Sequence, residues 1–169
     1  MKKIFLTVTV FILSLAALKA QNNAEVKLSY REEGSILPPM RVIDTLLHEY
    51  TDKDFSSNGH HLFIFLFNPT CGHCIDMGKL MGDNRTAFSK EKVLFLAGAQ
   101  MMPYLKSFYE ATNLGQAPEM KVGIDSAKTV DNLYYYRTLP QINIYDKNNR
   151  LVKIFYGDTP LDSLKKYAH

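Results

Sequence analysis

The sequence predicts a three-layer α/β domain with a central mixed sheet, and three observations support this fold class. Residues 61–67 and 92–97 form two continuous apolar runs, which are typical of strands buried on both faces. Segments with helical spacing alternate with the strands. Two alternating strands near the C-terminus are joined by residues 146–149, which predicts an antiparallel hairpin followed by a last helix.

The part of the chain before the first buried run is more polar. Residues 26–30 alternate and predict a short strand, with which 41–43 could pair. A turn is expected at 32–35, and Pro38-Pro39 excludes a helix there. Residues 51–59 are interpreted as a polar connector.

After residue 70, helices and strands are expected in turn. Helices are predicted at 75–81, 101–113 and 126–136, and a strand at 120–124. Residues 142–145 and 151–155 are the expected strands of the hairpin. In the last helix we expect Thr159 to be the N-cap, Pro160 the first helical residue, and Asp162 the partner in a capping box.

Length and composition indicate a single globular domain. The chain has 169 residues, of which 46% are hydrophobic and 22% charged, so disordered and coiled-coil classes are excluded. Lys2, Lys3 and Lys19 account for the net charge of +3, because the remaining 17 basic residues face 17 acidic ones. This balance predicts no nucleic-acid partner.

Residues 1–20 have the pattern of a signal peptide. Two lysines precede an apolar run at 4–18, and Ala20 is the expected last residue removed. The run is shorter than the roughly 20 residues of a membrane-spanning helix. We therefore expect a periplasmic or otherwise extracytoplasmic protein, associated with a membrane only if this segment stays uncleaved. Residues 21–40 would be an N-terminal extension, and 41–169 the folded domain.

The motif Cys71-Gly72-His73-Cys74 directly follows the first buried strand and opens a helix. A helix N-terminus favours an anion, so Cys71 is the expected attacking thiolate. Cys74, one turn further into the helix, would be buried and resolve the mixed disulfide. His73 would stabilise the Cys71 thiolate when protonated, and Gly72 would let the backbone bend tightly between the sulfurs.

Leu139-Pro140 precedes the first hairpin strand and is the second part of the predicted site. If the bond is cis, the backbone of Leu139 lies beside the cysteines, where it can pair with an extended substrate. The predicted substrate-binding residues are Thr70, Gly72, Leu139 and Pro140.

On these motifs the chain resembles the thioredoxin superfamily, and within it the exported TlpA-like branch. The matching features are the apolar strand at 62–67, the Cys-Gly-His-Cys tetrad, Thr138-Leu139-Pro140 before the hairpin, and Gly157 after it. Residues 101–124 resemble the αβ insertion of this branch. The resemblance covers residues 40–169 and implies a thioredoxin-like fold and a thiol–disulfide oxidoreductase.

Three positions depart from the family pattern. Thr70 stands where thioredoxins usually have Trp, and Phe65 stands where they often have a buried carboxylate. The alternative Glu of the branch is matched only by Ala99 and Gln100. The tetrad instead resembles that of protein disulfide isomerases, whose disulfide is more oxidising, so the direction of electron flow stays open.

The expected partners are exported proteins with cysteines and an unknown redox donor or acceptor, and no cofactor is expected. The alternative from another class is a thioredoxin-fold binding module whose disulfide only stabilises it. Zinc would require Cys71, Cys74 and two of three histidines, His60, His61 and His73. His60 and His61 are expected at the far end of the strand, roughly 20–30 Å from the cysteines, which argues against zinc.

Overall fold

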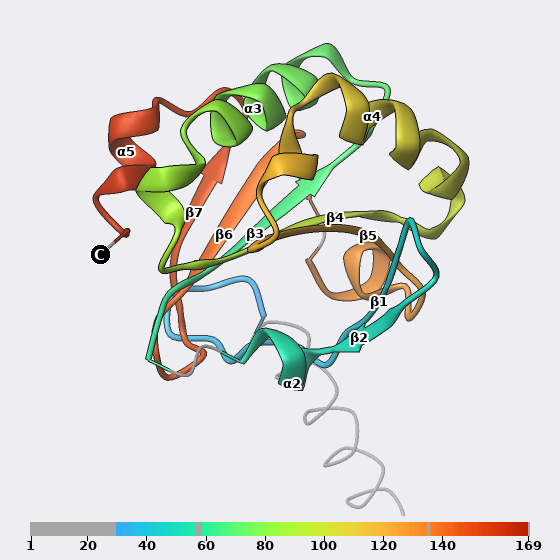
Figure 1. Cartoon of the computed structure of the whole chain (residues 1–169). Coiled ribbons are helices and arrows are strands. Elements are labelled where there is room, and N and C mark those ends of the chain that lie inside the picture. Colours follow the sequence, from blue (N-terminus) through green and yellow to red (C-terminus); the bar gives the residue numbers. More distant parts are fainter. Residues whose placement is uncertain (1–29, 57–58, 135, 169) are drawn as a thin grey trace, which may run out of the picture.

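The structure is a computed structural model, and it describes residues 30–56, 59–134 and 136–168. Seven strands form one mixed sheet in the order β2-β1-β5-β4-β3-β6-β7 (Figure 1). Strands β3, β4 and β5 are parallel, and the other neighbours pair antiparallel. The strands are β1 (Arg41–Asp44), β2 (Glu49–Thr51), β3 (Leu62–Phe67), β4 (Lys92–Gly98), β5 (Met120–Asp125), β6 (Gln141–Tyr145) and β7 (Leu151–Tyr156).

Helices cover the two faces of the sheet unequally. In Figure 1, α3 (Gly72–Asp83), α4 (Leu105–Ala111) and α5 (Leu161–Lys165) lie on one face. On the other face lie α2 (Asp52–Phe55) and a single π-helical turn, η4 (Val130–Tyr134). Three 3₁₀ turns complete the set: η1 (Arg85–Phe88), η2 (Ala99–Tyr104) and η3 (Leu114–Gln116). The predicted three-layer α/β class with a mixed sheet is confirmed.

The predicted central strands are buried on both faces. Phe63, Phe65 and Phe67 point toward the α3 side, while Leu62, Ile64 and Leu66 point toward the α2 side. All six side chains are at most 4% exposed. The two core clusters therefore lie on opposite faces of β3, which explains why its sequence is a continuous apolar run.

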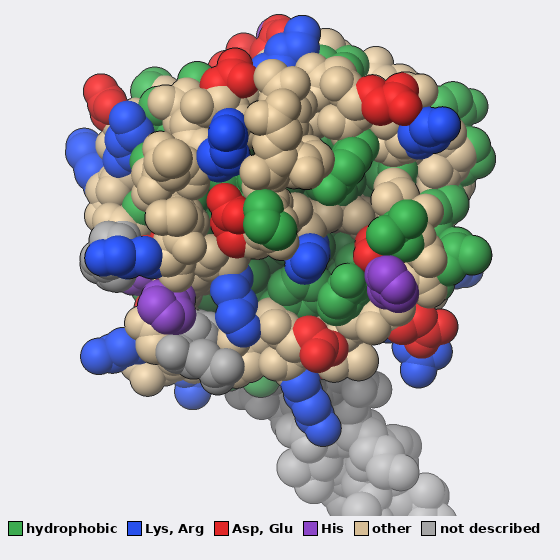
Figure 2. All heavy atoms as spheres, in the orientation of Figure 1, with side chains coloured by type: hydrophobic (Ala, Val, Ile, Leu, Met, Phe, Trp, Pro, Cys, Tyr) green, Lys and Arg blue, Asp and Glu red, His purple; other side chains and the backbone are tan. Residues whose placement is uncertain are grey.

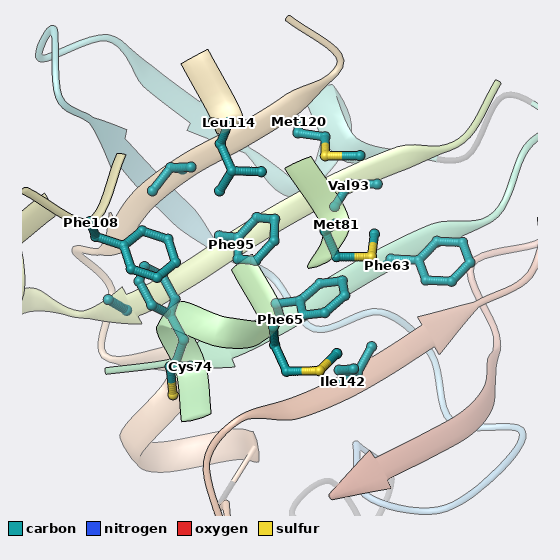
Figure 3. Close-up of a cluster of buried hydrophobic side chains, with 14 of the residues drawn as sticks. Phe63, Phe65, Cys74, Met81, Val93, Phe95, Phe108, Leu114, Met120 and Ile142 are labelled. Atoms are coloured by element: carbon teal, nitrogen blue, oxygen red, sulfur yellow. The ribbon is translucent and has the colours of Figure 1, made fainter. Parts of the chain in front are cut away.

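Aromatic rings fill the core beneath α3, as Figure 3 shows. Phe95 of β4 lies at its centre and is 1% exposed. Its ring stacks on Phe65 at 4.6 Å between centroids and meets the rings of Phe67 and Phe108, each at 6.0 Å. The helix with the Cys-Gly-His-Cys motif, α3, packs on this aromatic cluster.

Two glycines let α3 approach the end of α4 closely. A Cβ added at Gly78 would lie 2.7 Å from the Thr112 Cγ2 atom and 2.9 Å from the Phe108 ring. A Cβ at Gly82 would collide with the backbone carbonyl of Thr112. The small residues of α3 thus fix the position of this helix over the core.

The described part of the N-terminal extension packs on the domain. Tyr30 and Met40 are buried. Leu151, the first residue of β7, donates its backbone N–H to the Ser35 carbonyl and accepts from the Gly34 N–H. Residues 26–29 of the expected first strand lie outside the described residues, and β1 pairs with β2 and β5.

The helix expected at 126–136 is wrong in extent, because η4 is the only helical element among the described residues of this segment, 126–134 and 136. The buried Asp125 carboxylate accepts hydrogen bonds from the backbone N–H groups of Ala127 and Val130. Lys128 has a left-handed φ of 57°, which interrupts a regular helix. Side-chain hydrogen bonds at the start of the segment therefore compete with helical ones.

Three further expectations need correction. The polar connector at 51–59 contains the last residue of β2 and helix α2, where Thr51 donates its backbone N–H and its hydroxyl to Asp54. The helix expected at 101–113 starts as η2, because Pro103 lacks an N–H, and continues as α4. Thr159 does not cap α5: its hydroxyl donates to the Gly157 carbonyl, and Pro160 is the N-cap.

Candidate active site

The end of β3 places the cysteines at the start of α3. The Asn68 side chain accepts hydrogen bonds from the backbone N–H and the hydroxyl of Thr70, both at 2.9 Å. The Cys71 N–H then donates to the Asn68 carbonyl at 3.0 Å. This tight turn makes Cys71 the N-cap of α3, so the predicted helix begins earlier than 75, at Gly72.

The two thiols have different environments. Both are free; Cys71 is half-buried and Cys74 is 1% exposed. Burial is the main cause that raises the pKa of the Cys74 thiol from 9.0 to about 12, and the neighbouring Cys71 and Asp158 act in the same direction. A hydrogen bond to the Asn68 backbone opposes the shift. An accessible thiol thus stands next to one that holds its proton.

This difference predicts selective alkylation of the reduced protein. Because the raised pKa keeps Cys74 protonated and burial shields it, iodoacetamide at pH 8 should label Cys71 and leave Cys74 intact. Peptide mass spectrometry of the reduced protein would locate the label. The Cys71→Ser variant is the control and should take up none. Equal labelling of both cysteines would contradict the structure.

Leu139-Pro140 is a cis peptide bond in the structure. Leu139 packs against the same core cluster as Cys71 and Cys74. The Pro140 carbonyl accepts a hydrogen bond of 2.8 Å from the Gly157 N–H, which joins this loop to the one that follows β7. Gly157 has a left-handed φ of 69°, a conformation that favours glycine. The hydrogen bond between Gly157 and Pro140 ties the loop before β6 to the loop after β7.

His73 has a partner that the sequence reasoning missed. Its Nδ1 lies 2.9 and 3.1 Å from the two carboxylate oxygens of Asp158. An ionised carboxylate only accepts hydrogen bonds, so Nδ1 carries the proton that is donated. The two residues are 85 positions apart, and no local signal in the sequence indicates their contact.

The other predicted site residues are exposed near the dithiol or support it. Thr70 and Gly72 are exposed, and a Cβ at Gly72 would meet nothing within 4 Å. Gly72 has no positive φ, so the expectation that it is needed for a tight bend is wrong. A side chain at this position would instead extend into open space.

Phe65 occupies the position where the family often has an acid, and it stacks on Phe95. A small cavity of about 40 Å³ lies at the ends of β3 and β4, and Leu139 forms part of its lining. Gln100 and Met101 line it, as does Tyr136. Tyr136 is exposed whereas Tyr134 is buried, so the tyrosine run divides between surface and core.

Among the described residues, no group of three or more His, Cys, Asp or Glu side chains is arranged to hold a metal ion. The same residues include no helix long and apolar enough to cross a membrane. Figure 2 shows acidic and basic side chains interspersed over the face it presents.

Comparison with known proteins supports the fold. Neither protein-family models nor curated protein sequences match the chain. Solved structures do match. A putative thiol:disulfide interchange protein DsbE from Chlorobium tepidum is 18% identical with a TM-score of 0.65, covering 81% of this chain and 95% of that one.

Two Bacteroides structures give similar values. The C-terminal domain of an uncharacterized protein from Bacteroides fragilis is 21% identical with a TM-score of 0.65, covering 82% of this chain and 98% of that one. The thioredoxin domain of a thiol-disulfide oxidoreductase from Bacteroides vulgatus is 16% identical with a TM-score of 0.64, covering 82% and 99%. The chain has the thioredoxin-like fold. Its neighbours include proteins described as thiol–disulfide oxidoreductases.

Proposed function

We propose that the chain is an exported thiol–disulfide oxidoreductase that uses Cys71 and Cys74. The observation that carries this proposal is the asymmetric pair of free thiols at the start of α3, beside the cis-Pro140 loop. Residues 1–20, with their signal-peptide pattern, support export. The described fold is shared with solved structures of a putative thiol:disulfide interchange protein and of a thiol-disulfide oxidoreductase. The two thiols follow the buried strand β3.

In the reductive direction, the Cys71 thiolate attacks one sulfur of a substrate disulfide. The substrate S–S bond breaks, a mixed disulfide with Cys71 forms, and the released thiolate takes up a proton. The Cys74 thiolate then attacks the Cys71 sulfur and releases the second substrate thiol. Two electrons pass to the substrate, and the Cys71–Cys74 disulfide remains. The oxidative direction reverses these steps.

The second step needs Cys74 to lose its proton. In the dithiol, a hydrogen bond with Cys71 and the charge of Cys71 both contribute to the raised pKa of Cys74. Formation of the mixed disulfide removes the charge on Cys71 and its thiol hydrogen bond. Deprotonation of Cys74 therefore becomes easier at the stage where its thiolate is required.

We propose exported proteins with cysteines as the substrates. Cys71 is half-buried, and its neighbours Thr70 and Gly72 are exposed. An extended substrate chain would pair with the backbone at Leu139, which directly precedes the cis-proline. A separate redox donor or acceptor would then restore the dithiol or the disulfide.

The reduction potential of the pair tests this function. The protein is equilibrated with glutathione buffers, and its thiols are counted by labelling. A pair that cycles supports the oxidoreductase. A potential of about −180 mV or above indicates isomerase or oxidant activity, and one of about −270 mV or below indicates a reductase. A pair that stays oxidised in every buffer would contradict the proposal and favour a binding module with a structural disulfide.

A further inference from the structure

We propose that Asp158 is a positioning residue that sets the charge beside the dithiol through its contact with His73, and so makes the Cys71–Cys74 pair more reducing than its Cys-Gly-His-Cys sequence alone implies. This inference rests on the proposed oxidoreductase function and concerns the same site. It assigns a role to a residue outside the motif, 85 positions from His73 along the chain.

Asp158 lies between two residues that the fold holds in place. Gly157 on one side is hydrogen-bonded to Pro140, and the Thr159 side chain on the other is buried and donates to the Gly157 carbonyl at 3.2 Å. The carboxylate is therefore presented by a braced loop, although its own side chain is 64% exposed.

The contact between Asp158 and His73 connects the loop at Pro140 with the start of α3. The Gly157 N–H binds the Pro140 carbonyl, and the next residue, Asp158, binds His73 in the first turn of α3. Two hydrogen bonds and one peptide step thus lead from the substrate-side loop to the centre of the motif.

Asp158 changes the net charge at the start of α3. A protonated His73 alone would bring one positive charge to the start of α3, and it would stabilise the Cys71 thiolate. With Asp158 attached, the pair is neutral when His73 is protonated and negative when it is not. In either state the carboxylate lowers the local charge by one unit, which disfavours a thiolate.

The charge of Asp158 also acts on Cys74. The negative charge of Asp158 is one of the causes that raise the pKa of the Cys74 thiol, so this carboxylate already acts on the buried half of the dithiol. A stabilised thiolate favours the reduced form of the pair, and this makes the disulfide more oxidising. A carboxylate that disfavours thiolates shifts the balance toward a reductant.

The charge is tested by Asp158→Asn, which is nearly the same size and keeps an oxygen that can accept from Nδ1. The variant and the wild type are equilibrated with glutathione at pH 7. We expect the equilibrium constant to shift about threefold toward the dithiol, the size expected for an exposed charge pair, or about 15 mV at 29.6 mV per tenfold. Asp158→Glu, which restores the charge, should return the constant toward the wild-type value.

Asp162→Asn is the matched control. Asp162 is an exposed acid four residues further on, and its replacement changes the net charge equally. It should leave the equilibrium constant unchanged. If Asp158→Asn gave the wild-type constant, or if Asp162→Asn shifted it as much, the role of Asp158 would be refuted.

A double-mutant cycle with His73→Ala tests the path of the effect. His73 holds the exposed carboxylate beside the dithiol, so in the His73→Ala background the carboxylate is free to turn into solvent and the effect of Asp158→Asn should fall to less than half. An undiminished effect would show that Asp158 does not act through His73. Failure of the proposed function gives a different result: the wild-type pair itself would not equilibrate with glutathione. In that case the inference falls as well.

Discussion

Replacement of Cys71 by serine is expected to lower disulfide exchange by at least about 100-fold. A serine hydroxyl at the same place is not ionised near neutral pH, so it cannot attack a disulfide sulfur. Cys74 cannot substitute, because it is 1% exposed and its pKa is raised to about 12. The rate at which a disulfide-linked test peptide is reduced measures the loss, with the reduced wild type as reference.

The variant Cys74→Ser should behave in the opposite way. Cys71 can still attack, but the mixed disulfide has no second thiol to resolve it. Non-reducing electrophoresis should therefore show a covalent complex with a disulfide-containing protein substrate, and reductant should release it. The double variant, which lacks both thiols, is the control. Absence of any complex, while the wild type is active, would contradict the resolving role of Cys74.

Truncation of Phe95 to alanine should lower the free energy of unfolding more than any other substitution proposed for this protein. Its ring is 1% exposed and contacts three other aromatic rings beneath α3. Large-to-small changes of a buried Phe cost about 3–5 kcal/mol, out of a total free energy of unfolding of about 5–15 kcal/mol. Urea denaturation of the reduced protein measures the difference.

Tyr104→Ala supplies the comparison for the core truncation. Tyr104 is 50% exposed, and surface changes of this kind usually fall within about 0.5 kcal/mol. A loss below about 1.5 kcal/mol for Phe95→Ala would mean that the aromatic cluster is looser than the structure describes.

The sequence was most informative where one physical factor dominated. The runs at 62–67 and 92–97 became β3 and β4, because burial on both faces leaves room only for apolar side chains. The hairpin of β6 and β7 was equally clear from its alternation and its turn. Local patterns were less reliable where side chains bind the backbone. At Asp125 such hydrogen bonds replaced a regular helix by η4.

The site was predictable in its local part only. Cys71 and Cys74 follow from the motif and its strand, and the loop at Pro140 follows from the resemblance. The contact between His73 and Asp158 joins residues 85 positions apart, and no local spacing encodes such a pair. It depends on how β7 and the following loop return to α3, which is a property of the three-dimensional fold.

The extension also bears on self-association of the sheet. The last strand of an open sheet presents unpaired backbone groups, which invite a second chain to add a strand and aggregate. Leu151 gives both its N–H and its carbonyl to residues 34–35, so the start of β7 is already occupied. At the opposite edge, β2 is only three residues long. The start of β7 and the short β2 are thus poor templates for intermolecular strand pairing.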